Sequence, residues 1–400
     1  MSKLRKLVDK IKPSFSPGGK FEKLHSTFDA FETFLFVPNT TSKSGTHIHD
    51  AVDSKRTMIV VVIALLPALL FGMYNVGYQH YLAIGQAAVG FLPMFWYGFL
   101  AVLPIIVVSY GVGLGIEFVG AQIRKEEVQE GFLVTGMLIP LIVPVDTPLW
   151  MIALATAFAV IFAKEVFGGT GMNIFNVALV TRAFLFFAYP QSMSGNQVWV
   201  RTKETFGLGG GTVVDGFSGA TPLGQIGTST LPQAQIVDTM GNPYSLMDTI
   251  IGLMPGSIGE TSIIAIAIGA VILLITGVAS WKIMFSVFAG GALMSIIFQN
   301  FGPDTAVANL PWMYHLTLGG FAFGAVFMAT DPVTSARTET GKWIFGFLIG
   351  ALAIIIRVLN PGYAEGMMLA ILFMNIFAPL IDFYVVDANV KRRLKRVSNK

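Results

Sequence analysis

Long apolar segments occupy most of this chain, and each is long enough to cross, or nearly cross, a membrane. A helix that spans about 30 Å of hydrocarbon needs about 20 predominantly apolar residues. Lipid offers no partners to backbone N–H and C=O groups, so such segments are expected to be helices. The sequence predicts an all-α integral membrane protein with about ten transmembrane helices, at 57–75, 94–118, 132–147, 149–163, 171–189, 261–280, 283–300, 314–330, 343–359 and 366–386.

The scarcity of charged residues supports this fold class. Only 12% of the 400 residues are charged, whereas a soluble domain has roughly 25%. The chain has no cysteine, so we expect neither a disulfide nor thiolate ligands for an iron–sulfur cluster. The N-terminal region is basic and polar for more than fifty residues, and we therefore expect no cleavable signal peptide. We also expect no nucleic-acid partner.

Basic residues are concentrated at the two ends of the chain. Ten lysines and arginines lie within residues 1–56, and a second group follows the last apolar segment: Lys391, Arg392, Arg393, Lys395 and Arg396. The positive-inside rule places both ends in the cytoplasm, which requires an even number of spans. The loop 190–260 has few basic residues and is expected on the outer side.

Two pairs of segments resemble each other across the chain. The motif at 144–148, in which the third span ends, resembles 330–334, in which the eighth ends, and 171–175 resembles parts of 366–377. Both pairs lie five spans apart, and an odd number inverts the second unit relative to the first. We therefore predict two inverted five-helix repeats, with broken helices at their interface.

This organisation divides the chain into five regions. We expect a cytoplasmic basic arm, a first five-span repeat, an extracytoplasmic loop, a second five-span repeat and a cytoplasmic basic tail, at 1–56, 57–189, 190–260, 261–386 and 387–400.

Two places in the sequence suit a helix break inside the membrane. A glycine-rich stretch at 168–171 loosens one segment, and Asp331 followed by Pro332 resembles an N-cap with proline at the first helical position. Asn173 and Asn176 offer amide donors and acceptors on the same helix face. These residues predict a binding site at the repeat interface, although ordinary turns at span ends would also account for them.

A run of small residues in the outer loop surrounds a single threonine. Ser218, Gly219 and Ala220 precede Thr221 and keep bulk away from its oxygen, so a large group could approach it. The loop contains no histidine, and nothing nearby resembles a nucleophile elbow. From the residues alone, this run is either a plain turn or a modification site.

The run Asp-Gly-x-Ser-Gly-Ala-Thr at 215–221 resembles the acceptor motif for covalent FMN in a known family. This is the family of the B subunit of the Na⁺-translocating NADH:quinone reductase, and the D subunit of the related Rnf complex shares the motif. Val177 departs from the family pattern, which has proline there. The long basic N-terminal region favours the reductase family over the Rnf homologue. Further stretches resemble the family at 164–176, 182–190, 255–260, 319–324, 328–333 and 365–372.

The resemblance implies a redox function. Thr221 would carry FMN as a phosphoester added by a flavin transferase, within a loop formed by Asp215, Ser218, Gly219 and Ala220. A second, non-covalent flavin, riboflavin in the family, is expected near Asn173, Asn176 and Asp331.

The resemblance further implies a place in a membrane complex. The chain would be one component of a translocase in the bacterial inner membrane, assembled with other subunits. Electrons would leave NADH on another subunit, pass through the flavins and reach ubiquinone or menaquinone near the N-terminal arm, while Na⁺ is exported.

Ionisable residues inside spans are costly and are therefore functional candidates. Glu117 and Asp382 are candidates for a sodium path, because carboxylates suit a hard cation. Each could instead be paired or lie near the interface. Arg182 and Arg357 are expected to pair with carboxylates, or to stabilise a reduced flavin.

Other features receive simpler interpretations. The glycines at 111, 113 and 115 are typical of close helix packing. The histidines at 47 and 49, beside Asp50, have no further ligands nearby, so we expect no metal site. Two alternatives remain: the Rnf homologue, with ferredoxin and NAD as redox partners, and an inverted-repeat channel or transporter for a small solute. The second gives no reason for the motif at Thr221.

Overall fold

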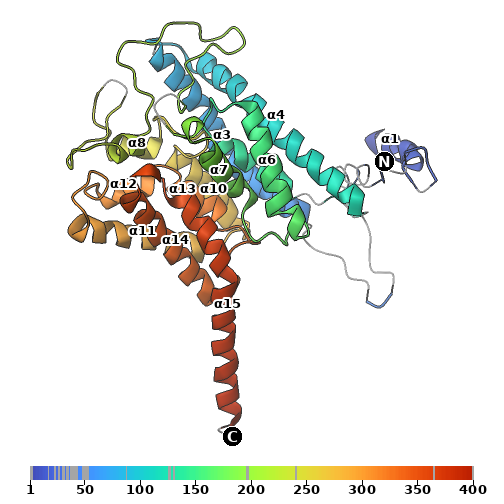
Figure 1. Cartoon of the computed structure of the whole chain (residues 1–400). Coiled ribbons are helices and arrows are strands. Elements are labelled where there is room, and N and C mark those ends of the chain that lie inside the picture. Colours follow the sequence, from blue (N-terminus) through green and yellow to red (C-terminus); the bar gives the residue numbers. More distant parts are fainter. Residues whose placement is uncertain are drawn as a thin grey trace.

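The computed structural model describes residues 3–398, apart from 17, 22–23, 26–27, 29–31, 33–35, 37–43, 47–53, 87, 125–127, 129–130, 195–197, 239–240 and 364. This described part is helical, and its only β-type pairings are two isolated bridges. Figure 1 shows most of the helices gathered in one bundle, with α1 apart from it and the last helix projecting from it.

Six helical segments of the described chain are long and apolar enough to cross a membrane. They are α3 (Ser54–Ala83), α4 (Phe91–Arg124), α6 (Leu149–Ala163) with the 3₁₀ turn η3 (Glu165–Phe167), α11 (Trp281–Phe301), α14 (Glu339–Leu359) and α15 (Met367–Ser398). Five of them contain one of the predicted spans, and α15 contains all but the first residue of the span at 366–386. The chain is thus a mostly helical, multi-pass membrane protein by the length and composition of its helices.

Three further apolar helices are each too short to cross a membrane. These are α5 (Phe132–Ile142), α7 (Val177–Ala188) and α10 (Ile263–Ile275). With 11 to 13 residues each, they are about 17 to 20 Å long at a rise of 1.5 Å per residue. The remaining elements are short: α1 (Lys3–Ile11), η1 (Lys12–Ser14), η4 (Pro190–Ser192), α8 (Pro222–Gly227), α9 (Leu246–Ile251), α12 (Trp312–Thr317), α13 (Phe321–Phe323), the π-helix η5 (Gly324–Met328) and η6 (Pro361–Tyr363).

Two of the predicted spans are broken. The segment 171–189 becomes helical only at Val177, because Gly168, Gly169 and Gly171 adopt φ values of +110°, +92° and +89°. The segment 314–330 contains two separate helical pieces, since α12 ends before Gly319, whose φ is +66°. The sequence predicted the break at 168–171 but not the one at Gly319.

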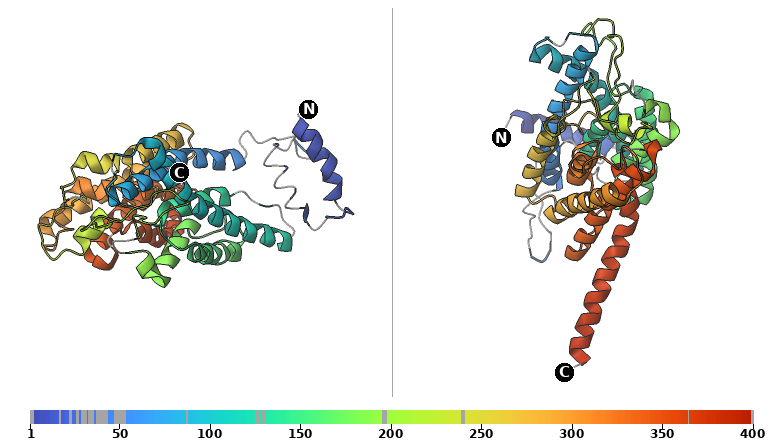
Figure 2. Two further views of the ribbon diagram at one scale, coloured as in Figure 1. Left: turned by 90° about the horizontal axis from the view of Figure 1, so that it is seen from above. Right: turned by 90° about the vertical axis from the view of Figure 1, so that its left-hand side faces the viewer.

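Helices from the two halves of the chain pack together. Helix α3 packs on α4 and on α10, α6 on α4 and α7, and α14 on both α11 and α15. Figure 2 shows that much of the loop 190–260 lies at the end of the bundle farthest from the C-terminus.

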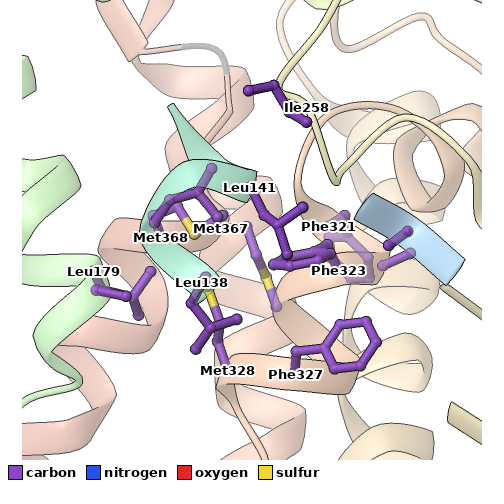
Figure 3. Packing of buried hydrophobic residues seen from close by; sticks show 14 of the residues in the cluster. Leu138, Leu141, Leu179, Ile258, Phe321, Phe323, Phe327, Met328, Met367 and Met368 are labelled. Carbon is purple, nitrogen blue, oxygen red and sulfur yellow. The ribbon is translucent and has the colours of Figure 1, made fainter. Parts of the chain in front are cut away.

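The buried core lies where the short helices of both halves meet. Figure 3 shows Leu138 and Leu141 of α5 close to Met367 and Met368 of α15. Around them are Leu179, Ile258 and the row Phe321, Phe323, Phe327 and Met328, all buried in one cluster. The broken segments are therefore held by packing against one another.

Glycines permit the closest helix contacts. A Cβ on Gly98 of α4 would overlap the carbonyl of Met73 on α3, and one on Gly77 would overlap that of Met94. Helices α11 and α14 approach each other in the same way through Gly290 and Gly350.

Of the three glycines predicted to allow close packing, only one does so. A Cβ on Gly113 would overlap the ring of Phe132, whereas Cβ atoms on Gly111 and Gly115 would have no neighbour within 4 Å in the described chain. The sequence does not show which of these glycines faces a neighbouring helix, because all three lie in the same apolar segment.

We predict that Gly98→Ala destabilises the protein by about 1–3 kcal/mol, because the new methyl group must push α3 and α4 apart. Gly111→Ala, on the same helix, is the matched control and is expected to be neutral or stabilising by about 0.5–1 kcal/mol. Thermal unfolding of both variants in detergent measures the difference. Equal unfolding temperatures for the two variants would show that α3 and α4 leave room for a methyl group at Gly98.

Candidate functional site

Thr221 begins a short helix and faces open space. It is the N-cap of α8, with φ −65° and ψ 153°, and Pro222 occupies the first helical position. Its Oγ1 accepts a hydrogen bond from Gly224 N at 3.0 Å. In the described chain its hydroxyl hydrogen has no acceptor, so the oxygen remains open to substitution.

The neighbours of Thr221 leave room for a large group. Gly219 and Ala220 are buried and small, Ser218 is half-buried, and Asp215 is exposed at the start of the motif. The backbone turns at Gly216, whose φ of +81° suits glycine.

Thr221 lies in the wall between two cavities. The larger contains about 1010 Å³ of empty space, part of it open to solvent. Phe186, Trp199 and Tyr363 contribute aromatic walls to it, and the rings of Phe186 and Tyr363 meet edge to face at 4.5 Å. The smaller cavity is polar on one side, where Ser257, Glu260, Thr261 and Glu365 line it.

A buried guanidinium lies beside these cavities. Arg182 of α7 donates to the carbonyl of Ile142, to Ser257 Oγ at 3.1 Å and to the carboxylates of Glu260 and Glu365. Its side chain is 3% exposed. The predicted pairing of Arg182 with a carboxylate is confirmed. It joins the end of α5, the loop before α10 and the turn before α15.

A second buried guanidinium bonds only to backbone carbonyls in the described chain, so the predicted pairing of Arg357 with a carboxylate is not found. Arg357 of α14 donates to the carbonyls of His315 at 2.6 Å, and of Leu318 and Glu365 at 3.2 Å. It therefore stabilises the break after α12. Arg182 and Arg357 together balance the charges of Glu260 and Glu365, as buried charges require.

The second predicted site is a cleft between the two halves. Asn176 is the N-cap of α7, where its Oδ1 accepts from Ala178 N at 3.1 Å and Leu179 N at 3.3 Å. Its Nδ2 donates to Asp331 Oδ2 at 3.1 Å. Asn176 and Asp331, which are 155 residues apart, are thus brought together.

Two local predictions about these residues are wrong. Asp331 does not cap an α-helix: it closes a single turn by accepting from Val333 N and Thr334 Oγ1, and α14 starts later, capped by Thr338. The side chains of Asp331 and Thr334 favour local hydrogen bonds over a continued helix. Asn173 does not share a helix face with Asn176, because it precedes the helix and donates to the carbonyl of Phe175.

The cleft holds about 810 Å³ of empty space, including a part open to solvent. Its polar rim contains Asn173, Asn176, Asp331 and Lys164. Its apolar walls come from α3, α5, α10 and η5, represented by Val61, Val134, Leu138, Leu273 and Phe327. Both halves of the chain contribute to it.

The two candidate ion-path carboxylates have different surroundings. Glu117 of α4 is buried and pairs with the ammonium of Lys164. Asp382 of α15 accepts from Arg337 N at 2.7 Å, Thr338 N at 3.0 Å and Thr338 Oγ1 at 2.6 Å, and so fixes the start of α14. Neither lines the cavities at Thr221.

Sequence reasoning missed three residues that matter here. Lys164, Glu260 and Glu365 were only parts of stretches that resemble the family, and no role was predicted for them. Their partners are far away in sequence: 47 residues separate Lys164 from Glu117, and 183 separate Glu365 from Arg182. The histidines at 47 and 49 and Asp50 lie outside the described residues.

Comparisons with known proteins agree on one family. A model of the NQR2, RnfD, RnfE family matches residues 41–391. The chain is 46% identical to the B subunit of the Na(+)-translocating NADH-quinone reductase of Ectopseudomonas mendocina, with 98% of this chain and 99% of that protein aligned. It is 45% identical to the protein of the same name from Chromohalobacter salexigens and 44% to that from Klebsiella pneumoniae, in each case over 98% of this chain and at least 96% of the relative. These matches confirm the resemblance that the motifs predicted.

We predict that Arg182→Leu destabilises the protein by about 3–5 kcal/mol, since Glu260 and Glu365 would lose their buried counter-charge. Lys203→Met is the control: Lys203 pairs with Asp146 at 3.0 Å, but its side chain is 71% exposed, so the change should stay within about 1 kcal/mol. Thermal unfolding in detergent compares the two. A small effect of Arg182→Leu would contradict the structural role of the cluster.

Proposed function

Because the chain belongs to the NQR2, RnfD, RnfE family, we propose that it is the B subunit of a sodium-exporting NADH:quinone reductase. It carries FMN on Thr221, and NADH is oxidised on another subunit. Electrons reach ubiquinone or menaquinone, and Na⁺ leaves the cell. The single observation that supports this most strongly is the open hydroxyl of Thr221 at the wall of an aromatic-lined cavity.

The surroundings of Thr221 fit a phosphate-linked flavin. Ser218, Gly219 and Ala220 present no bulky side chain, so the oxygen is reachable. Phe186, Trp199 and Tyr363 offer flat apolar surfaces of the kind that bind a planar ring system. FMN would supply one- and two-electron redox chemistry, while Thr221 holds it by a phosphoester. Asp215 is exposed and accessible to the flavin transferase that would attach the group.

The cleft between the halves fits a flavin without phosphate. Its lining combines apolar walls with a few polar groups, as is typical of ligand pockets. Asn173, Asn176 and Asp331 supply amide and carboxylate groups that can bind the polar edge of an isoalloxazine ring. The apolar walls match the body of the ring. We propose that riboflavin binds here.

Helix packing supports the inverted repeat and the membrane topology that we propose. In the first half α4 packs on α6, α6 on α7 and α5 on α7. In the second half the equivalent pairs, α11 with α14, α14 with α15 and η5 with α15, also pack. Across the halves, α3 packs on α10 and α7 on α15. Ten membrane segments then place both termini in the cytoplasm of a bacterium and the loop 190–260 outside.

The proposed sodium path includes Glu117 and Asp382. Glu117 is the stronger candidate, since one of its oxygens has no hydrogen-bond partner in the described chain. The D subunit of an Rnf complex is the second candidate function, because the family includes it. The relatives from the NADH-quinone reductase align with 98% of this chain, which includes the basic N-terminal region and favours the reductase assignment.

We predict that Thr221→Val abolishes covalent flavin. The chain, produced with its flavin transferase, should show in-gel fluorescence and a peptide mass increased by FMN only when Thr221 is present. Thr228→Val, at the other end of α8, is the matched control and should keep the flavin. An unmodified Thr221 peptide in the wild-type protein would refute the proposal, and it would also favour the transporter alternative.

We predict that Asn173→Ala weakens binding of the non-covalent flavin by about tenfold, the effect of losing one hydrogen bond of about 1.4 kcal/mol. Asn173 is half-buried and its side chain donates only to the carbonyl of Phe175 in the described chain, so the variant should fold. Riboflavin retained after gel filtration is measured by fluorescence, with Asn300→Ala on the exposed end of α11 as control. Equal retention in the two variants would remove Asn173 from the site.

A further inference from the structure

One lysine belongs to both the ion pair and the cleft. Lys164 follows α6 directly and is only 4% exposed. Its ammonium contacts Glu117 Oε1 on α4, and its side chain also lines the cleft beside Asn173, Asn176 and Asp331. A single positive charge therefore lies between a candidate cation ligand and a candidate cofactor site.

Only one of the two carboxylate oxygens of Glu117 takes part in this ion pair. The residue is 4% exposed, and its Oε2 is buried without a hydrogen-bond partner in the described chain. Buried oxygens of this kind normally have partners, and carboxylate oxygens are suitable ligands for a hard cation such as Na⁺.

The surrounding charges are already balanced. Next to this pair, Arg124 contacts Glu165 at 2.7 Å, so the two acids and two bases of the group sum to zero. Adding Na⁺ at Glu117 while the Lys164 ammonium stays in place would leave an uncompensated positive charge in a poorly solvated region, which is costly. Na⁺ and the ammonium therefore compete for one carboxylate.

We propose that Lys164 is an internal counter-ion that exchanges with Na⁺ at Glu117 in response to negative charge in the cleft. This inference rests on the proposed function, because the negative charge arises when electrons from NADH, oxidised on another subunit, reduce a cofactor bound there. The ammonium then turns toward the cleft and frees both oxygens of Glu117. When the electrons leave for quinone, the ammonium returns and displaces Na⁺.

Thermodynamic linkage makes the exchange reciprocal. If reduction strengthens Na⁺ binding at Glu117, then Na⁺ must raise the reduction potential of the cofactor in the cleft by the same coupling free energy. Lys164 is a positioning residue in this scheme, because it acts through Glu117. If the ion pair were merely structural, reduction would not change the affinity for Na⁺, and Na⁺ would not change the reduction potential of the cofactor.

The test uses the purified complex, oxidised or reduced with dithionite, at mildly alkaline pH so that protons do not compete for the carboxylate. Equilibrium binding of tracer Na⁺ is measured for wild type, Lys164→Met, Glu117→Gln and the control Lys282→Met. Lys282 also pairs with a glutamate, Glu339, but at the exposed start of α11. Subtracting the Glu117→Gln data isolates binding that depends on Glu117. Lys164→Gln replaces Lys164→Met if the latter does not assemble.

We expect the Glu117-dependent affinity for Na⁺ to be about tenfold higher in the reduced wild type than in the oxidised one. In Lys164→Met the affinity should be high in both states, and in Lys282→Met it should match wild type. The reduction potential of the cofactor should rise with Na⁺ in wild type and in Lys282→Met, but not in Lys164→Met. Equal affinities in the two states of wild type, or a redox difference that survives in the Lys164 variant, overturns the proposal.

Flavin content separates this failure from a failure of the proposed function. A wild-type complex that lacks the non-covalent flavin contradicts the proposed function. A complex that holds both flavins but binds Na⁺ equally in both states contradicts only the role of Lys164.

Discussion

Helix breaks inside the bundle depend on two buried arginines. A helix end leaves carbonyl groups without partners, and lipid cannot supply any. Arg182 donates to the carbonyl of Ile142, the last residue of α5, and Arg357 donates to those of His315 and Leu318 at the end of α12. Arginine suits this task because it has five donors in a rigid fork and stays charged. Arg182 thus stabilises the end of α5, and Arg357 stabilises the break after α12.

The breaks in turn create the candidate sites. A continuous helix presents only side chains to its neighbours, whereas a broken one leaves a gap between elements. The cleft forms where the glycine-rich stretch before α7 faces the turn at Asp331. The cavities at Thr221 form where the loop before α10 and the turn before α15 meet around Arg182. The candidate sites and the buried ion pairs therefore share residues.

The sequence predicted elements that depend on hydrophobicity better than those that depend on backbone geometry. The apolar run at 149–163 coincides with α6, and the run at 283–300 lies within α11. The break at Gly319 was not predicted, since a lone glycine in an apolar run gives no indication of its φ. The motif singled out Thr221 because its neighbours in sequence are also its neighbours in space. The partners of Arg182 could not be predicted, because they come from three distant parts of the chain.

The two candidate sites differ in how firmly their charges are held. Arg182 has four partners on three segments, so its cluster is fixed and suits a cofactor that stays attached to the protein. Lys164 has one partner, Glu117, whose second oxygen is unused in the described chain. A flexible four-carbon stem lets an ammonium change partners at little steric cost, which a guanidinium bonded to several groups cannot do. The use of lysine at the cleft and arginine at Thr221 therefore separates a place where charge can move from a place where it cannot.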